Sequence, residues 1–189
     1  MYKKYILSAL ALGLSGFGFS QTFMQGLGVN LIMQSLPGYS VMPVVGIIYS
    51  PKFTFFEKEH SSLSLGLPVS TAYAGNYDTQ AGNENNKTIG WMLDAPLMIN
   101  YNYGTGSNKK NSGRFGFFAG IGYGYHCNPF TDNSGDDVAH VESGFGPVFN
   151  TGIRIARDPR HNFEIRFSYM KATDVSKSDI YSIGGIFNW

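Results

Sequence analysis

Two histidines lie near residues with which an imidazole can do hydrolytic chemistry. His126 and His140 flank Asp136 and Asp137, and Ser143 follows. An imidazole oriented by a carboxylate can take a proton from a serine or from water. The stretch is polar, however, and supplies Asp, Ser and His by composition alone. We therefore expect solvated loop histidines and no catalytic residue.

The same stretch raises the question of a calcium site, because hard cations bind several carboxylate or carbonyl oxygens. Its carboxylates are Asp132, Asp136, Asp137 and Glu142. Residues 133–137 nevertheless have ordinary turn composition. Cys127 is the only cysteine, which excludes a CxxC metal site. No helical pattern follows the glycine-rich run 116–124, so a phosphate cradle is not indicated. We expect no metal and no cofactor.

Four further charged residues fall on the polar faces of alternating segments. They are Asp94, Arg154, Glu164 and Arg166. Opposite charges at inward-facing positions can pair across a narrow interior. We predict that these side chains form a structural charge cluster inside the fold, in preference to lining a gated path through it.

The segments that carry these charges follow a period of two. In residues 88–103 the odd positions are almost all large and apolar, and in 162–171 phenylalanine, isoleucine and tyrosine alternate with polar residues. Such alternation is typical of β-strands. The predicted strands are 23–33, 39–50, 60–73, 88–103, 114–126, 145–157, 162–171 and 179–189. Pro43, Pro68, Pro96 and Pro147 lie inside them, where we expect bulges.

The chemistry of the two strand faces distinguishes a membrane barrel from a secreted sandwich. The polar faces hold mainly Gly, Ser and Asn, and the lysines lie almost wholly outside the strands, Lys52 among them. Small residues suit a crowded lumen better than a solvated face. The apolar faces carry aromatic residues near both strand ends, as at two membrane interfaces. We predict an all-β, eight-stranded, antiparallel up-and-down transmembrane β-barrel, with the sandwich as alternative.

Length, charge and the first residues restrict the function further. The chain has 189 residues and a formal charge of +1, which gives no electrostatic footprint for nucleic acid. Lys3 and Lys4 precede a short apolar run, and small residues precede position 21. We predict a signal peptide at 1–20 and an outer-membrane barrel domain at 21–189. With the first strand leaving the periplasm, the two long outward loops are 74–87 and 127–142.

The last strand carries a family resemblance. Residues 180–189 alternate in apolar character and end on Trp189, and together with the export signal and residues 93–101 they resemble small outer-membrane β-barrel proteins of the OmpX/OmpA-like class, particularly those of Bacteroidetes-type bacteria. The resemblance implies an outer-membrane location. It also implies that the barrel assembly machinery recognises the last strand through Tyr181, Ile183, Phe187 and Trp189.

These features favour a non-enzymatic outer-membrane protein with a structural or surface-interaction role in its extracellular loops. The alternatives are a narrow channel or carrier of small hydrophobic ligands, and a small barrel component of an export assembly. The expected partners are outer-membrane lipid and the assembly machinery, and we expect a monomer.

Overall fold

Strands account for most of the described residues. The computed structural model describes residues 22–35, 42–77, 88–108, 113–131, 139–156, 158, 161–173 and 178–189. The predicted signal peptide and the first three residues of the second predicted strand, 39–41, lie outside the described residues. The strands are β1 (Thr22–Met24), β2 (Gly26–Ser35), β3 (Met42–Tyr49), β4 (Lys52–Phe55), β5 (Ser61–Gly66), β6 (Val69–Tyr77), β7 (Thr88–Gly104), β8 (Phe115–Thr131), β9 (Ala139–Ala156), β10 (Asn162–Lys171) and β11 (Asp179–Asn188).

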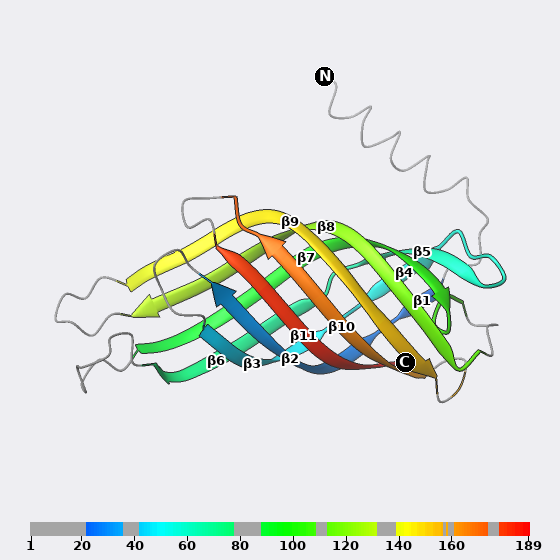
Figure 1. The fold of residues 1–189 in the computed structure, drawn as a ribbon, viewed down its shortest axis with the longest axis horizontal. Coiled ribbons are helices and arrows are strands. Elements are labelled where there is room, and N and C mark those ends of the chain that lie inside the picture. The colour runs from blue at the N-terminus through cyan, green and yellow to red at the C-terminus, as the bar shows by residue number, and fades with distance from the viewer. Residues whose placement is uncertain are drawn as a thin grey trace, which may run out of the picture.

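These segments make eight barrel strands, because three strands are each interrupted once. β1 continues into β2 past Gln25, β3 into β4 past residues 50–51, and β5 into β6 past residues 67–68. Every neighbouring pair is antiparallel, β11 pairs with β2, and β7 pairs with β8 to close the sheet (Figure 1). The predicted eight-stranded up-and-down barrel is confirmed.

The prolines have smaller effects on the strands than the sequence predicts. Pro68 lies at the break between β5 and β6. Bulges at the other three positions are wrong predictions, because Pro43, Pro96 and Pro147 pair in continuous register with Met33, Gly124 and Tyr123. A proline removes only its own donor, and the flanking ladder bonds maintain the register.

The second strand is longer than expected. The region predicted as a turn, 51–59, contains β4, so the expectation that Lys52 lies outside the strands is also wrong. Pro51 is accommodated at the interruption, where the Ser50 N–H donates to the Gly26 carbonyl at 2.7 Å and the Leu67 N–H donates to the Pro51 carbonyl at 3.1 Å. These two bonds join the sheet across the break.

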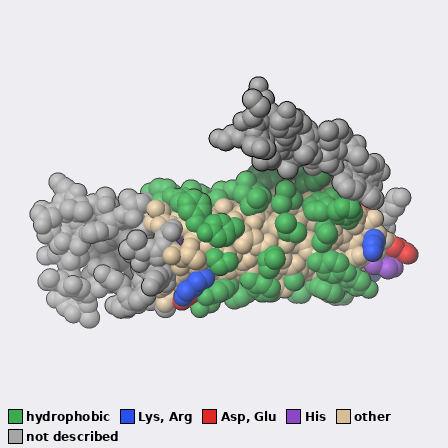
Figure 2. All heavy atoms as spheres, turned by 90° about the horizontal axis from the view of Figure 1, so that it is seen from above, with side chains coloured by type: hydrophobic (Ala, Val, Ile, Leu, Met, Phe, Trp, Pro, Cys, Tyr) green, Lys and Arg blue, Asp and Glu red, His purple; other side chains and the backbone are tan. Residues whose placement is uncertain are grey.

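The barrel is apolar outside and largely polar inside. Val45, Ile121 and Phe115 have about 70% of their surface exposed, whereas Glu164, Arg154 and Asn150 are buried in the lumen. Figure 2 shows hydrophobic side chains spread over the length of the face of the wall that it presents. An apolar exterior on a closed barrel is the arrangement that a bilayer requires. The closed wall with its apolar exterior is therefore that of a barrel that spans a membrane, as the sequence predicts.

Aromatic side chains mark both rims of this apolar surface. One end of the barrel, called the inner end below, is where the described chain begins at Thr22 and ends at Trp189. The exposed rings near it include Phe23, Tyr49, Tyr101, Tyr103, Phe115, Phe163, Phe187 and Trp189. Near the opposite, outer end they include Tyr73, Trp91 and Phe145. Amphipathic rings favour the headgroup region, so the two groups correspond to the two interfaces. The described residues contain no helix that is long and apolar enough to cross a membrane.

Candidate functional site

A buried ionic group occupies the inner half of the lumen. It consists of Lys52, Arg154, Glu164 and Arg166, called the Glu164 cluster below. Glu164 Oε2 accepts hydrogen bonds from Arg154 Nε at 2.7 Å and from Lys52 Nζ at 3.2 Å. Its Oε1 accepts from Arg166 Nη2 at 2.6 Å and from Arg166 Nε at 2.9 Å. One carboxylate therefore binds three cations, all of them buried.

Neutral side chains complete the surroundings of this cluster. Arg154 Nη1 donates to Asn102 Oδ1 at 2.8 Å, and Lys52 Nζ donates to Asn188 Oδ1 at 3.0 Å. The centroid of the Phe118 ring lies 4.5 Å from Arg154 Cζ and 5.5 Å from Arg166 Cζ. A guanidinium over an aromatic face is stabilised by the ring quadrupole. The cluster thus blocks the inner lumen with a connected network.

The strand period and the register explain how the cluster forms. Glu164 and Arg166 are two residues apart on β10, so both face the lumen. Arg154 stands directly opposite Glu164 in the β9–β10 ladder. Lys52, on β4, is a member of the cluster that the sequence analysis did not predict. The pattern that could have revealed it is the alternation of Lys52 and Thr54 with Phe53 and Phe55.

The structure places the fourth predicted member, Asp94, elsewhere. Asp94 stands opposite His126 in the β7–β8 ladder, and its Oδ1 lies 2.5 Å from His126 Nδ1. His126 is 2% exposed, so its expected place in a solvated loop is wrong. Its Nε2 has no partner among the described residues. An aspartate–imidazole pair orients a base, but no serine or thiol contact to Nε2 accompanies it in the described part of the chain.

An apolar layer separates the Glu164 cluster from the outer mouth of the lumen. Its residues are Ile32, Val44, Ala72, Met92, Met98, Val148, Met170, Ala172 and Ile180. Beyond this layer the amide of Asn128 donates to Gln34 Oε1 at 2.6 Å. The lumen is therefore filled successively by ions, by apolar side chains and by amides, as expected for eight strands.

The candidate metal ligands of the sequence are only partly covered by the described residues. The carboxylates Asp132, Asp136 and Asp137 lie outside the described residues, and within the described ones no group of three His, Cys, Asp or Glu side chains is placed to hold a metal. Cys127 is buried and unpaired. The absence of a metal or cofactor remains a prediction.

The residues of the predicted assembly signal lie on the outside of β11. Ile183, Phe187 and Trp189 are exposed, and the rings of Phe187 and Trp189 stack with centroids 6.4 Å apart. Tyr181 stands opposite Tyr169, with ring centroids 5.1 Å apart. The Trp189 N–H donates to the Gln25 carbonyl at 2.8 Å, at the seam where the first and last strands meet.

Known proteins resemble this chain in fold but not detectably in sequence. No protein-family model and no curated protein sequence matches the chain. Solved structures do match. Ail, the attachment invasion locus protein of Yersinia pestis, has a TM-score of 0.61 at 10% identity over 89% of this chain and 98% of that one. Neisserial surface protein A has a TM-score of 0.58 at 11% identity over 89% and 97%. The chain therefore has the fold of the small eight-stranded outer-membrane β-barrels.

Proposed function

We propose that this protein is a non-enzymatic surface-interaction barrel whose outer strand ends bind a partner. The observation that carries the proposal is the unequal strand length. β7, β8 and β9 have 17, 17 and 18 residues, whereas β10 and β11 have 10 each. Figure 1 shows β8 and β9, like β6 and β7, reaching farther at the outer end than β2, β10 and β11. The longest hairpins of such barrels face the cell exterior.

The extended part of β8 and β9 is a two-stranded ribbon with free edges. The two strands pair from Cys127 with Ser143 to Thr131 with Ala139. The β7–β8 ladder ends at Leu93 with Cys127. The β9–β10 ladder ends at Met170 with Val148, and beyond it the Phe145 carbonyl still accepts a hydrogen bond from the Thr173 N–H at 3.0 Å. Residues 128–131 therefore extend about 13 Å with no ladder partner on the β7 side. Unpaired edges of this kind bind extended peptide segments by strand addition.

The two structural neighbours fit this proposal by their names alone. One is an attachment protein and the other a surface protein. At 10–11% identity they support the fold, and attachment by this chain is our proposal.

Shortening the ribbon is the direct test. Replacing residues 128–142 by Asn-Gly joins Cys127 to Ser143, which already face each other in the ladder, by a favoured two-residue turn. In cells that display the protein, we expect adhesion to cultured cells and to immobilised matrix proteins to fall to the level of cells lacking it. The barrel should still form, because the deletion removes only one of the lumen contacts described above, the hydrogen bond between Asn128 and Gln34.

A matched control separates the effect of the ribbon from that of residues 132–138, which connect β8 to β9. In this control only residues 132–138 are replaced by Asn-Gly, so both strand extensions remain. We expect it to adhere like the natural protein. Equal adhesion by all three forms, or none by the natural protein, would contradict the proposal.

The channel alternative makes a separate prediction. Because the Glu164 cluster and the apolar layer obstruct the described lumen, the folded protein in a planar bilayer should give no steady current above the lipid baseline. A sixteen-stranded porin inserted in the same way is the positive control, since its lumen is water-filled. Reproducible ohmic steps from this protein would favour the channel instead.

The proposal includes two further partners, outer-membrane lipid and the barrel assembly machinery, and a monomeric state. The apolar wall and the two aromatic rims support outer-membrane lipid as the immediate partner. Exposure of Ile183, Phe187 and Trp189 beside the closing seam supports recognition of β11 by the assembly machinery. A barrel that closes on itself has no free edge within the membrane, which supports a monomer.

A further inference from the structure

One hydrogen-bond donor in the lumen has no acceptor. Arg166 is 5% exposed, and its Nε and Nη2 bind Glu164, with Nη2 also donating to Ser50 Oγ at 3.1 Å. Its Nη1 is buried and has no partner among the described residues. A buried guanidinium N–H that has no acceptor destabilises the fold by its full desolvation penalty. The position therefore calls for an acceptor from outside the described residues.

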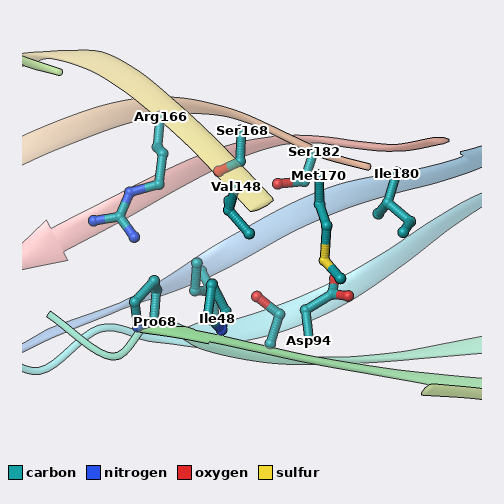
Figure 3. Close-up of a pocket in the computed structure, with 11 residues that line it drawn as sticks. Ile48, Pro68, Asp94, Val148, Arg166, Ser168, Met170, Ile180 and Ser182 are labelled. Carbon is teal, nitrogen blue, oxygen red and sulfur yellow. The ribbon is translucent and has the colours of Figure 1, made fainter. Parts of the chain in front are cut away.

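A small cavity lies beside this guanidinium. Its volume is about 40 Å³, and its polar lining comes from Arg166, Asp94, Ser70, Ser168 and Ser182. A site for one water needs roughly 10–15 Å³ on this measure, so the cavity accepts about three water-sized groups. Figure 3 shows the Arg166 guanidinium at one end of the cavity and Asp94 at the other, with Ser168 and Ser182 on the wall between β10 and β11.

The charges around the cavity favour an anion at the Arg166 end. Three buried cations share the single carboxylate of Glu164, which leaves the Glu164 cluster with two positive charges in excess when all its groups are ionised. A buried charge without a partner is costly. Glu164 does not line the cavity. Among the described residues, Asp94 is the one carboxylate in its lining, and Asp94 Oδ1 lies 2.5 Å from His126 Nδ1.

The serines offer further donors. Ser70 Oγ accepts a hydrogen bond from Asn30 Nδ2 at 3.0 Å, so its own hydroxyl proton remains free to donate elsewhere. Ser168 and Ser182 stand opposite each other in the β10–β11 ladder and both line the cavity. A monovalent ion the size of chloride fits this space.

We propose that the lumen binds a small monovalent inorganic anion of the halide class, coordinated by Arg166 Nη1 and by the hydroxyls of the cavity serines. The ion supplies the acceptor that Nη1 lacks and offsets part of the excess charge of the Glu164 cluster. It acts as a structural ion of the closed lumen, so the proposal stands independently of the surface-interaction role.

The first test uses the natural sequence. In crystals of the folded barrel grown in sodium bromide, we expect an anomalous bromide peak within hydrogen-bond distance of Arg166 Nη1. In detergent at fixed pH and fixed ionic strength, the thermal unfolding midpoint should be about 3–6 °C higher in bromide or chloride than in gluconate, for a roughly tenfold excess of halide over its dissociation constant. The absence of either result overturns the proposal.

Two variants place the effect in this cavity. Ser182→Val removes a donor and fills space without touching the Glu164 cluster, and it should abolish the halide-dependent shift. Lys171→Gln changes an exposed cation and should retain the shift. A shift that survives in Ser182→Val places the ion elsewhere and overturns the proposal. So does a stability that depends on pH but not on halide, because the excess charge is then relieved by proton loss from Lys52.

Discussion

Replacing Glu164 by Gln is expected to lower the free energy of unfolding of the barrel by about 3–5 kcal/mol, the range measured when one partner of a buried ion pair is removed. Gln keeps the shape of the side chain and two polar atoms, so packing changes little. The negative charge, however, is lost. Lys52, Arg154 and Arg166 then lie in the lumen without a countercharge, since Glu164 is the carboxylate that binds all three.

The measurement is the urea midpoint of the refolded protein in detergent, followed by circular dichroism and by the mobility difference between heated and unheated samples on SDS gels. The matched control is Asp179→Asn. Asp179 pairs with Lys171 at 2.8 Å, but both side chains are at least 30% exposed, and we expect a loss of about 0–1 kcal/mol. Similar losses in the two variants would show that the Glu164 cluster is not what stabilises the lumen.

A second substitution separates charge from hydrogen bonding. Adding Lys52→Met to Glu164→Gln removes one of the uncompensated cations and puts an apolar chain of similar length in its place. Part of the stability should return, because a buried cation without a partner costs more than an apolar side chain there. No recovery would mean that lost hydrogen bonds, and not excess charge, account for the effect.

The barrel itself was predictable from sequence because its determinants are local. Each strand has to alternate, since one face meets lipid and the other a crowded lumen, and this alternation is visible within ten residues. β10 shows the pattern most clearly, with Phe163, Ile165 and Phe167 outward and Glu164 and Arg166 inward. Counting such segments gave the correct number of strands.

Lys52 was missed because a local rule was applied too strictly. Pro51 and the short run after it favour a turn, and a lysine beside them is usually solvated. In the fold, the missing proline N–H coincides with an interruption of the strand, and the chain resumes as β4 with Lys52 facing inward. The attraction of Glu164, 112 residues away in sequence, is a tertiary contact that no local pattern contains.

The pairing of Asp94 with His126 was inaccessible for a different reason. Which residues meet across two strands depends on register, and a shift of one residue reverses every side chain. The register of β7 with β8 follows from their connection, where Gly104 and Gly106 adopt φ values of +72° and +73°. Sequence alone placed Asp94 in the lumen but could not say which inward-facing residue would stand beside it.

The seam between the first and last strands gives the second large prediction: Gly28→Ala should prevent closure of most of the refolded barrel. A Cβ at Gly28 would lie 2.0 Å from the Gly185 carbonyl oxygen and 2.7 Å from Ile186 Cα. Both obstacles are backbone, so no rotamer change relieves them, and β2 must separate from β11. The cost should exceed the roughly 1–3 kcal/mol of ordinary overpacking.

The heat-modifiable band on SDS gels reports closure, and we expect it to fall severalfold for Gly28→Ala. Gly66→Ala is the matched control, because its Cβ would meet nothing closer than 3.5 Å, an ordinary contact with the Pro51 carbonyl. It should refold like the natural protein or gain slightly, since alanine restricts the unfolded chain. If Gly28→Ala closes as completely as Gly66→Ala, the two strands do not approach as closely as the structure shows, and β11 meets β2 in another register.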